Sequence, residues 1–133
     1  MSKLAGKTAI IIEDDHTSIK VLEQLLKQQG VSTKTILDSS GVETNLEAVN
    51  APDVIFLDLE MPHMNGYQVL EWIQGQEKFE DVPVVAYTTH ISHLNDAKRA
   101  GFHSFLGKPI DGRNFGKQLE RILDGESVWE VPS

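Results

Sequence analysis

The sequence contains no cysteine and no long apolar run, and its basic residues are few. Without cysteine, disulfide bonds, thiolate metal sites and a cysteine nucleophile are all excluded. The first apolar run covers residues 9–12 and stops at Glu13, and no later run approaches the length of a bilayer-spanning helix. We therefore expect neither a secretory signal nor membrane association, and a cytoplasmic location.

The charge balance also excludes one class of partner. The chain has 12 Lys and Arg against 20 Asp and Glu, a formal net charge of −8. A domain this acidic has no broad electrostatic surface for nucleic acid. It is better suited to binding cations or basic protein surfaces.

The length of 133 residues allows one domain with one buried core, and the hydrophobic pattern indicates its class. Short β-branched runs alternate five times with segments whose apolar residues recur at helical spacing. Such alternation predicts an α/β fold with a doubly wound parallel sheet and helices on both faces. The strand-like segments are residues 8–12, 31–37, 54–57, 84–87 and 104–106.

Polar side chains stand where several of these strands end. Glu13 and Asp14 follow the first strand, Asp58 the third and Thr88 the fourth, while Lys108 lies just beyond the fifth. Sites in open parallel sheets form beyond the carboxyl ends of the strands, where the strand order reverses. If the first and third strands are neighbours there, these side chains converge in one crevice.

A set of converging carboxylates must either take up protons or recruit a cation, because like charges repel. Oxygen ligands with no cysteine or histidine among them favour Mg²⁺, which needs only a few carboxylates. Any one of the acids alone is explained as a solvated strand end. Three strand ends and a lysine together favour a site.

At these residues the chain resembles the response regulator receiver family, over about residues 7–123. The motifs are Ile-Ile-Ile-Glu13-Asp14, Asp58-Leu-Glu-Met-Pro-His-Met-Asn-Gly66, Thr88 and Lys108-Pro109. The resemblance implies a flavodoxin-like fold with five helices and a five-stranded sheet in the order 2-1-3-4-5. It also implies a receiver domain over residues 1–125, followed by a short tail, 126–133, that either folds back on the domain or docks elsewhere.

The resemblance assigns a role to each polar residue. Asp58 is expected to accept a phosphoryl group from a phosphohistidine of a sensor histidine kinase or a histidine phosphotransfer protein, with Mg²⁺ as cofactor. Asp14 is expected to bind the metal directly, Glu13 to act largely through water, and Glu60 to supply its backbone carbonyl. Lys108 would contact the phosphoryl group, from a Lys-Pro bond that is cis in the family.

The family also implies that phosphorylation switches a surface that binds a downstream protein target. Thr88 would turn towards the phosphoryl group, and Phe105 would follow it inward. Glu60 and His90 lie at positions that affect how long the phosphoryl group survives. The segment between Thr88 and Gly101 is shorter than usual, so a short or irregular fourth helix is expected.

Other readings use the same residues differently. A phosphorylation-independent pseudo-receiver scaffold would need none of the acids. An aspartate-nucleophile phosphatase would need a second Asp where Glu60 stands, and a flavin carrier would not place acids at 13–15 next to a phosphate. We therefore expect a signalling phosphoacceptor that assists its own phosphorylation and dephosphorylation, not an enzyme.

Overall fold

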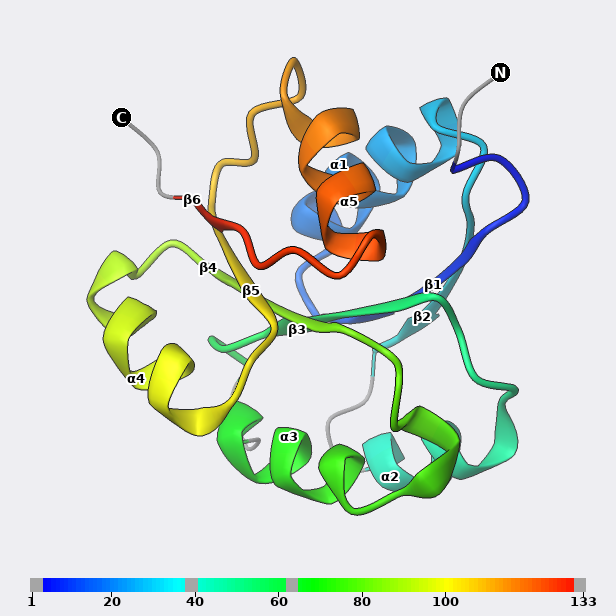
Figure 1. The fold of residues 1–133 in the computed structure, drawn as a ribbon, viewed down its shortest axis with the longest axis vertical. Helices are drawn as coiled ribbons and strands as arrows, with labels where there is room; N and C mark the ends of the chain where they lie inside the picture. The colour runs from blue at the N-terminus through cyan, green and yellow to red at the C-terminus, as the bar shows by residue number, and fades with distance from the viewer. Residues whose placement is uncertain (1–3, 38–40, 62–64, 131–133) are drawn as a thin grey trace.

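Strands and helices alternate along the chain in the computed structural model, which describes residues 4–37, 41–61 and 65–130 (Figure 1). The strands are β1 (Thr8–Ile12), β2 (Ser32–Ile36), β3 (Val54–Asp58), β4 (Val84–Thr88), β5 (Ser104–Gly107) and β6 (Trp129–Glu130). The helices are α1 (His16–Gln28), α2 (Val42–Ala48), α3 (Gly66–Gln74), α4 (Leu94–Ala100) and α5 (Phe115–Leu123). Two 3₁₀ turns, η2 (Glu77–Phe79) and η3 (Ile91–His93), precede β4 and α4.

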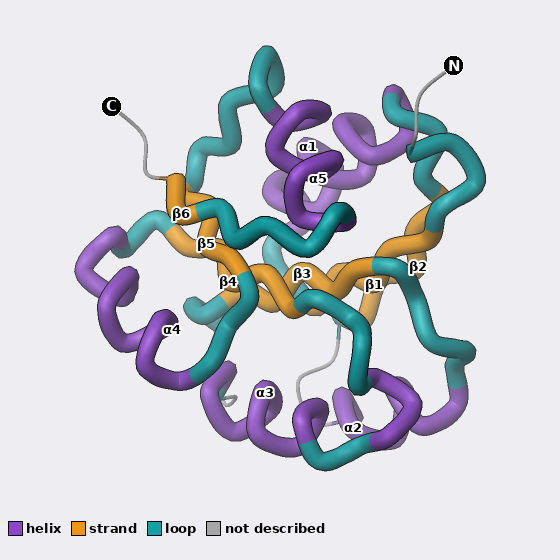
Figure 2. Tube along the Cα trace, viewed as in Figure 1, coloured by secondary structure: helices purple, strands orange, loops and turns teal. Residues whose placement is uncertain are grey.

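All strand pairs are parallel, in the order β2-β1-β3-β4-β5-β6. Helices α1 and α5 cover one face of the sheet, and α2, α3 and α4 cover the other (Figures 1 and 2). The central strands β3 and β4 are buried throughout, as their continuous apolar sequences predict. The doubly wound α/β fold with five α-helices is confirmed.

Each face of the sheet carries its own apolar core. On the α1 and α5 side, Leu22 and Leu26 of α1 meet Leu119 and Ile122 of α5 over the sheet. On the other side, Leu46, Leu70 and Ala97 come from α2, α3 and α4 in turn. Both layers hold the sheet between them, so the carboxyl ends of its strands meet at one fixed edge.

The prediction of five strands is wrong by one. Residues 129–130 form β6, which pairs with β5 at Phe105 and Leu106. The backbone N–H of Phe105 also donates to the carbonyl of Val128 at 2.8 Å. The described part of the tail therefore folds back on the domain, which was one of the two expectations for it.

The fourth helix is short, as expected. A single 3₁₀ turn, η3, leads into the seven residues of α4, and only Ala97 of that helix is buried. No helix in the described ranges combines the length and apolar character that crossing a bilayer demands.

The turn after β3 is built by the end of the motif that begins at Asp58. Asn65 caps α3 by accepting a hydrogen bond from the N–H of Tyr67 at 2.9 Å. Gly66 follows, and a Cβ there would lie 2.8 Å from Cδ2 of Leu59, so any larger residue would need the Leu59 side chain to shift. The three residues of the motif before Asn65, at 62–64, lie outside the described ranges.

Candidate functional site

Three carboxylates meet at the carboxyl edge of the sheet, as the sequence predicts. Asp58 ends β3 beside Glu13, because β1 and β3 are neighbours that pair Ile12 with Leu57. One oxygen each of Glu13, Asp14 and Asp58 lies within 4.8 Å of the others. Glu13 and Asp58 are buried, whereas Asp14 is the most accessible of the three.

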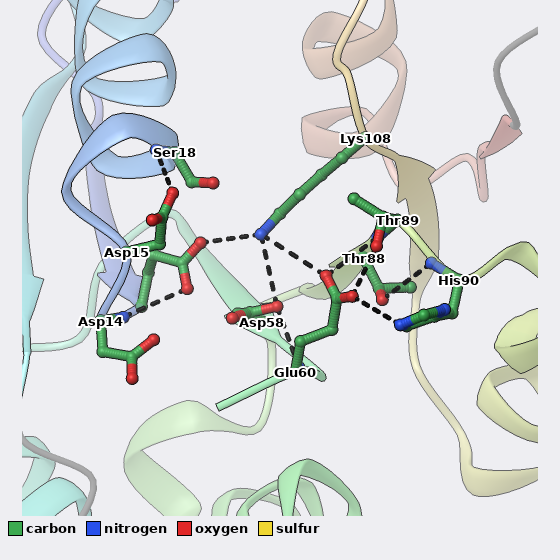
Figure 3. A network of polar contacts seen from close by, with 10 residues as sticks. Asp14, Asp15, Ser18, Asp58, Glu60, Thr88, Thr89, His90 and Lys108 are labelled. Atoms are coloured by element: carbon green, nitrogen blue, oxygen red, sulfur yellow. Dashed lines mark hydrogen bonds and ion pairs between the residues drawn. The ribbon is translucent and has the colours of Figure 1, made fainter. Parts of the chain in front are cut away.

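Lys108 reaches into this cluster from the loop after β5 (Figure 3). Its Nζ lies 2.8 Å from Oε1 of Glu13, 3.4 Å from Oδ1 of Asp58 and 3.9 Å from Oε2 of Glu60. The ammonium thus lies within ion-pair distance of Glu13, Asp58 and Glu60, and it is itself largely buried.

The backbone around Lys108 fixes where its side chain starts. The Lys108–Pro109 peptide bond is cis, as expected from the resemblance. The N–H of Lys108 donates to the carbonyl of Thr88 at 2.8 Å, which continues the pairing of β5 with β4. The residue is therefore tied to the strand whose end also forms the site.

The pKa values of the two buried acids, Asp58 and Glu13, shift in opposite directions. Burial and the neighbouring Glu13 raise the pKa of Asp58 to about 8, although Lys108 acts in the opposite sense. Burial would also raise the pKa of Glu13, but hydrogen bonding with Asp58 and Lys108 brings it below its ordinary value. Two adjacent buried carboxylates cannot both ionise at low cost, so of this pair Asp58 is the one that holds a proton more strongly.

Glu60 joins the edge of the site to the loop after β4. Its backbone N–H donates to Oδ1 of Asp58 at 3.0 Å. Its carboxylate accepts from the N–H and the hydroxyl of Thr89, at 3.0 and 2.5 Å, and lies 3.0 Å from Nε2 of His90. The side chain of Glu60 is thus directed to this loop and stands outside the cluster of three acids.

The two residues expected to act as a switch are both buried. The Thr88 hydroxyl accepts a hydrogen bond from the N–H of His90 at 3.1 Å, at the flank of the site (Figure 3). Phe105 lies in the core on the α2, α3 and α4 side of the sheet, opposite Ala86 and Trp129 in register. Asp15, placed outside the site by its sequence position, caps α1 by accepting from the N–H of Ser18 at 2.8 Å.

One residue at the site was missed by sequence reasoning. Tyr87 reads as the last apolar residue of a buried strand, yet its ring lies beneath Lys108, with Nζ 4.5 Å from the ring centroid. Its side chain is 1% exposed, and its hydroxyl has no hydrogen-bond partner within the described part of the chain. A polar atom one residue before the strand end was the signal available.

The sequence is similar to those of known signalling proteins. The polar-differentiation response regulator DivK of Brucella ovis is 27% identical over 120 residues, covering 88% of this chain and 96% of DivK. The hybrid signal transduction histidine kinase L of Dictyostelium discoideum is 32% identical over 116 residues, which are 82% of this chain and 7% of that protein.

Solved structures show the same fold. A putative response regulator from Chloroflexus aurantiacus superposes with a TM-score of 0.80 at 22% identity, over 89% of this chain and 98% of that one. A receiver domain of a sensor histidine kinase from Pseudomonas aeruginosa, solved with a magnesium ion coordinated in its active-site cleft, gives 0.79 at 24% identity, over 90% and 99%.

The family model for the response regulator receiver domain matches residues 9–120. That match begins at the second residue of β1 and runs through β5 into α5. Glu13, Asp14 and Asp58 all fall inside it. The chain therefore belongs to the response regulator receiver domain family of two-component signalling.

Proposed function

We propose that this chain accepts a phosphoryl group on Asp58 from a phosphohistidine, carried by a sensor histidine kinase or a histidine phosphotransfer protein. The observation that carries the proposal is the pairing of a buried carboxyl with two further acids and a lysine at one sheet edge. The proposal keeps the cytoplasmic location expected from the sequence. A downstream protein target would read the phosphorylated state.

The residues at the sheet edge fit a divalent metal ion. Glu13, Asp14 and Asp58 are hard oxygen donors whose ligand atoms already lie within 4.8 Å of one another. With the backbone carbonyl of Glu60 they make a set that suits Mg²⁺, which keeps several of its own waters. When bound, Mg²⁺ would neutralise these carboxylates and the charge of the transferred phosphoryl oxygens.

The protein's own groups would then position the reaction. An oxygen of Asp58 forms the new O–P bond as the N–P bond of the phosphohistidine breaks, and the electron pair of that bond remains on the imidazole. Lys108, now 3.4 Å from Asp58, would move its ammonium onto a phosphoryl oxygen. The Thr88 hydroxyl would turn towards the phosphoryl group, and Phe105 would take up the space that Thr88 leaves.

The chain would be a phosphoacceptor, not an enzyme acting on a separate substrate. Loss of the phosphoryl group requires water to reach the phosphorus atom, and Glu60 and His90 lie beside Asp58 through the contacts Glu60 N–H to Asp58 and Glu60 to His90. These two residues would therefore set the lifetime of the acyl phosphate, as the sequence suggests.

The test is to incubate the protein with Mg²⁺ and acetyl phosphate and to measure its intact mass. One phosphoryl adduct is expected for the wild type, and none for Asp58→Asn or after addition of a chelator. Asp53→Asn is the matched control, because Asp53 lies just before β3, at the end of the strand opposite Asp58. There its side chain accepts a hydrogen bond from the N–H of Thr8. A wild-type protein that folds but never gains the adduct would instead be a scaffold that works without phosphate.

A further inference from the structure

Lys108 is held by more than its carboxylate partners. Its side chain crosses from the end of β5 to the acids beyond β1 and β3, so its ammonium must be fixed at the end of a long flexible stem (Figure 3). Tyr87 lies beneath that ammonium, 4.5 Å from Nζ to the ring centroid. The face of an aromatic ring attracts a cation at this distance.

The ring itself cannot easily move. Tyr87 packs edge-to-face against Phe56, with centroids 6.3 Å apart and planes at 87°. Phe56 in turn contacts Phe115 of α5, with centroids 6.2 Å apart. All three rings are buried, so the packed core fixes the surface on which Lys108 rests.

The hydroxyl of Tyr87 needs a separate explanation. It is buried and has no hydrogen-bond partner among the described residues, which is a costly arrangement for a polar group. Burial, together with the charges of Glu13 and Asp58, raises the pKa of Tyr87 above its usual range, so the group stays a protonated donor. The Glu13 carboxylate is the nearby acceptor: Lys108 donates to its Oε1 and the N–H of Asp14 to its Oε2, and in this arrangement neither oxygen bonds to the Tyr87 hydroxyl.

We propose that Tyr87 is a positioning residue for Lys108 and Glu13. Its ring holds the ammonium over the site, and its hydroxyl donates to Glu13 once Lys108 leaves that carboxylate. The role of the ring depends only on the contacts between Tyr87, Lys108 and the neighbouring rings. The role of the hydroxyl rests on the proposed function, because Lys108 leaves Glu13 when a phosphoryl group arrives.

Two substitutions separate the role of the Tyr87 ring from that of its hydroxyl. Tyr87→Phe keeps the ring and removes the hydroxyl, while Tyr87→Leu removes both. If Tyr87→Leu does not keep a cooperative melting transition, Tyr87→Met fills the same space with a flexible side chain. Tyr67→Phe is the matched control, because its hydroxyl lies 3.2 Å from Nδ1 of His93, away from the acids.

The ring is tested by the proton chemical shifts of the lysine ε-methylene groups. In the wild type, the Lys108 shift should lie upfield of that of exposed Lys20, remain there in Tyr87→Phe and move to the exposed value in Tyr87→Leu. Lys78 and Lys98 lie over Phe79 and Trp129, so their shifts serve as internal controls that no Tyr87 variant should change. A wild-type Lys108 shift equal to that of Lys20 would overturn this part, whether or not Asp58 is phosphorylated.

The consequence for the reaction is tested with the same variants. Tyr87→Leu should lower the maximal rate of phosphorylation by acetyl phosphate about 10- to 100-fold, because a misplaced ammonium no longer meets the phosphoryl oxygens. The apparent Mg²⁺ affinity should change little, since the acids remain. An unchanged maximal rate would show that the ring does not position Lys108 for the reaction.

The hydroxyl is tested with beryllofluoride, a stable mimic of the phosphoryl group, in the presence of Mg²⁺. Tyr87→Phe should bind it about tenfold more weakly, because one hydrogen bond to the charged Glu13 is lost. Equal binding by Tyr87→Phe and the wild type would overturn the role of the hydroxyl. If even the wild type fails to bind the mimic or to be phosphorylated, the proposed function and the hydroxyl's role fail together, while the methylene shifts still decide the role of the ring.

Discussion

The ionisation of Asp58 couples the site to the stability of the fold. The folded protein holds this carboxyl with a pKa of about 8, against an ordinary value of 3.8. Between those two pH values the unfolded chain loses the proton and the folded chain keeps it. The folded state therefore binds more protons in this window, and its stability falls as the pH rises.

Asp58→Asn removes this dependence, because an amide stays neutral at every pH. Without divalent cations, the variant should exceed the wild type in unfolding free energy by about 1–3 kcal/mol at pH 8. The difference should shrink as the pH falls through 3.8, below which Asp58 is protonated in both states. Urea unfolding at a series of pH values measures it, with Asp53→Asn as control. Parallel pH profiles for the wild type and Asp58→Asn would contradict the prediction.

Single residues differed in how far the sequence could place them. Glu13, Asp14 and Asp58 could be brought together because a parallel sheet aligns its strand ends, and the structure agrees. Tyr87 could not, because the side-chain alternation that buries it beneath Lys108 looks the same as that of any core tyrosine. Whether its hydroxyl finds a partner depends on packing that no local pattern records.

At the scale of elements, the largest difference from expectation is β6. Strand periodicity needs several residues to become visible, and this strand has two. Its position is set by tertiary contacts instead: the N–H of Val128 donates to the Ser104 hydroxyl at 2.9 Å, and Lys98 of α4 lies over the ring of Trp129 at 5.1 Å. The short α4, by contrast, was expected because the segment between Thr88 and Gly101 is shorter than is usual in the family.

Trp129 is the residue that ties β6 to the domain. It packs against the core on the α4 side and pairs in register with Phe105. Trp129→Ala should lower the unfolding free energy by about 1–3 kcal/mol, less than for a fully buried tryptophan, since Trp129 is only partly covered. Denaturant unfolding followed by circular dichroism measures this, and Glu130→Ala, an exposed neighbour on the same strand, should cost much less. Equal effects of the two variants would mean that β6 contributes only its backbone.

At the scale of the whole molecule, the fold concentrates negative charge that it cannot neutralise by itself. The chain carries a net charge of −8, and Glu13, Asp14 and Asp58 share one edge of the sheet. Lys108 lies within 4 Å of Glu13 and Asp58 there. Such an edge gains stability from any cation that binds the folded state and not the unfolded one. If these acids bind a metal as proposed, the fold should be more stable in its presence.

Mg²⁺ should therefore stabilise the folded protein against heat and denaturant. At a concentration 100 times its dissociation constant, the gain should be about 2.7 kcal/mol, and a chelator should reverse it. Asp14→Asn should lose most of this gain, because it removes the most accessible acid of the cluster. Asp15→Asn is the control: its side chain caps α1, a role that asparagine also fills, and it should respond to Mg²⁺ as the wild type does.

Sodium chloride at equal ionic strength should not reproduce the effect, since screening acts on exposed charges everywhere and not on one buried site. If sodium chloride matched Mg²⁺, or if Asp15→Asn lost the response as fully as Asp14→Asn, the cation would be acting on the overall charge of the molecule and not at the edge where Asp58 lies.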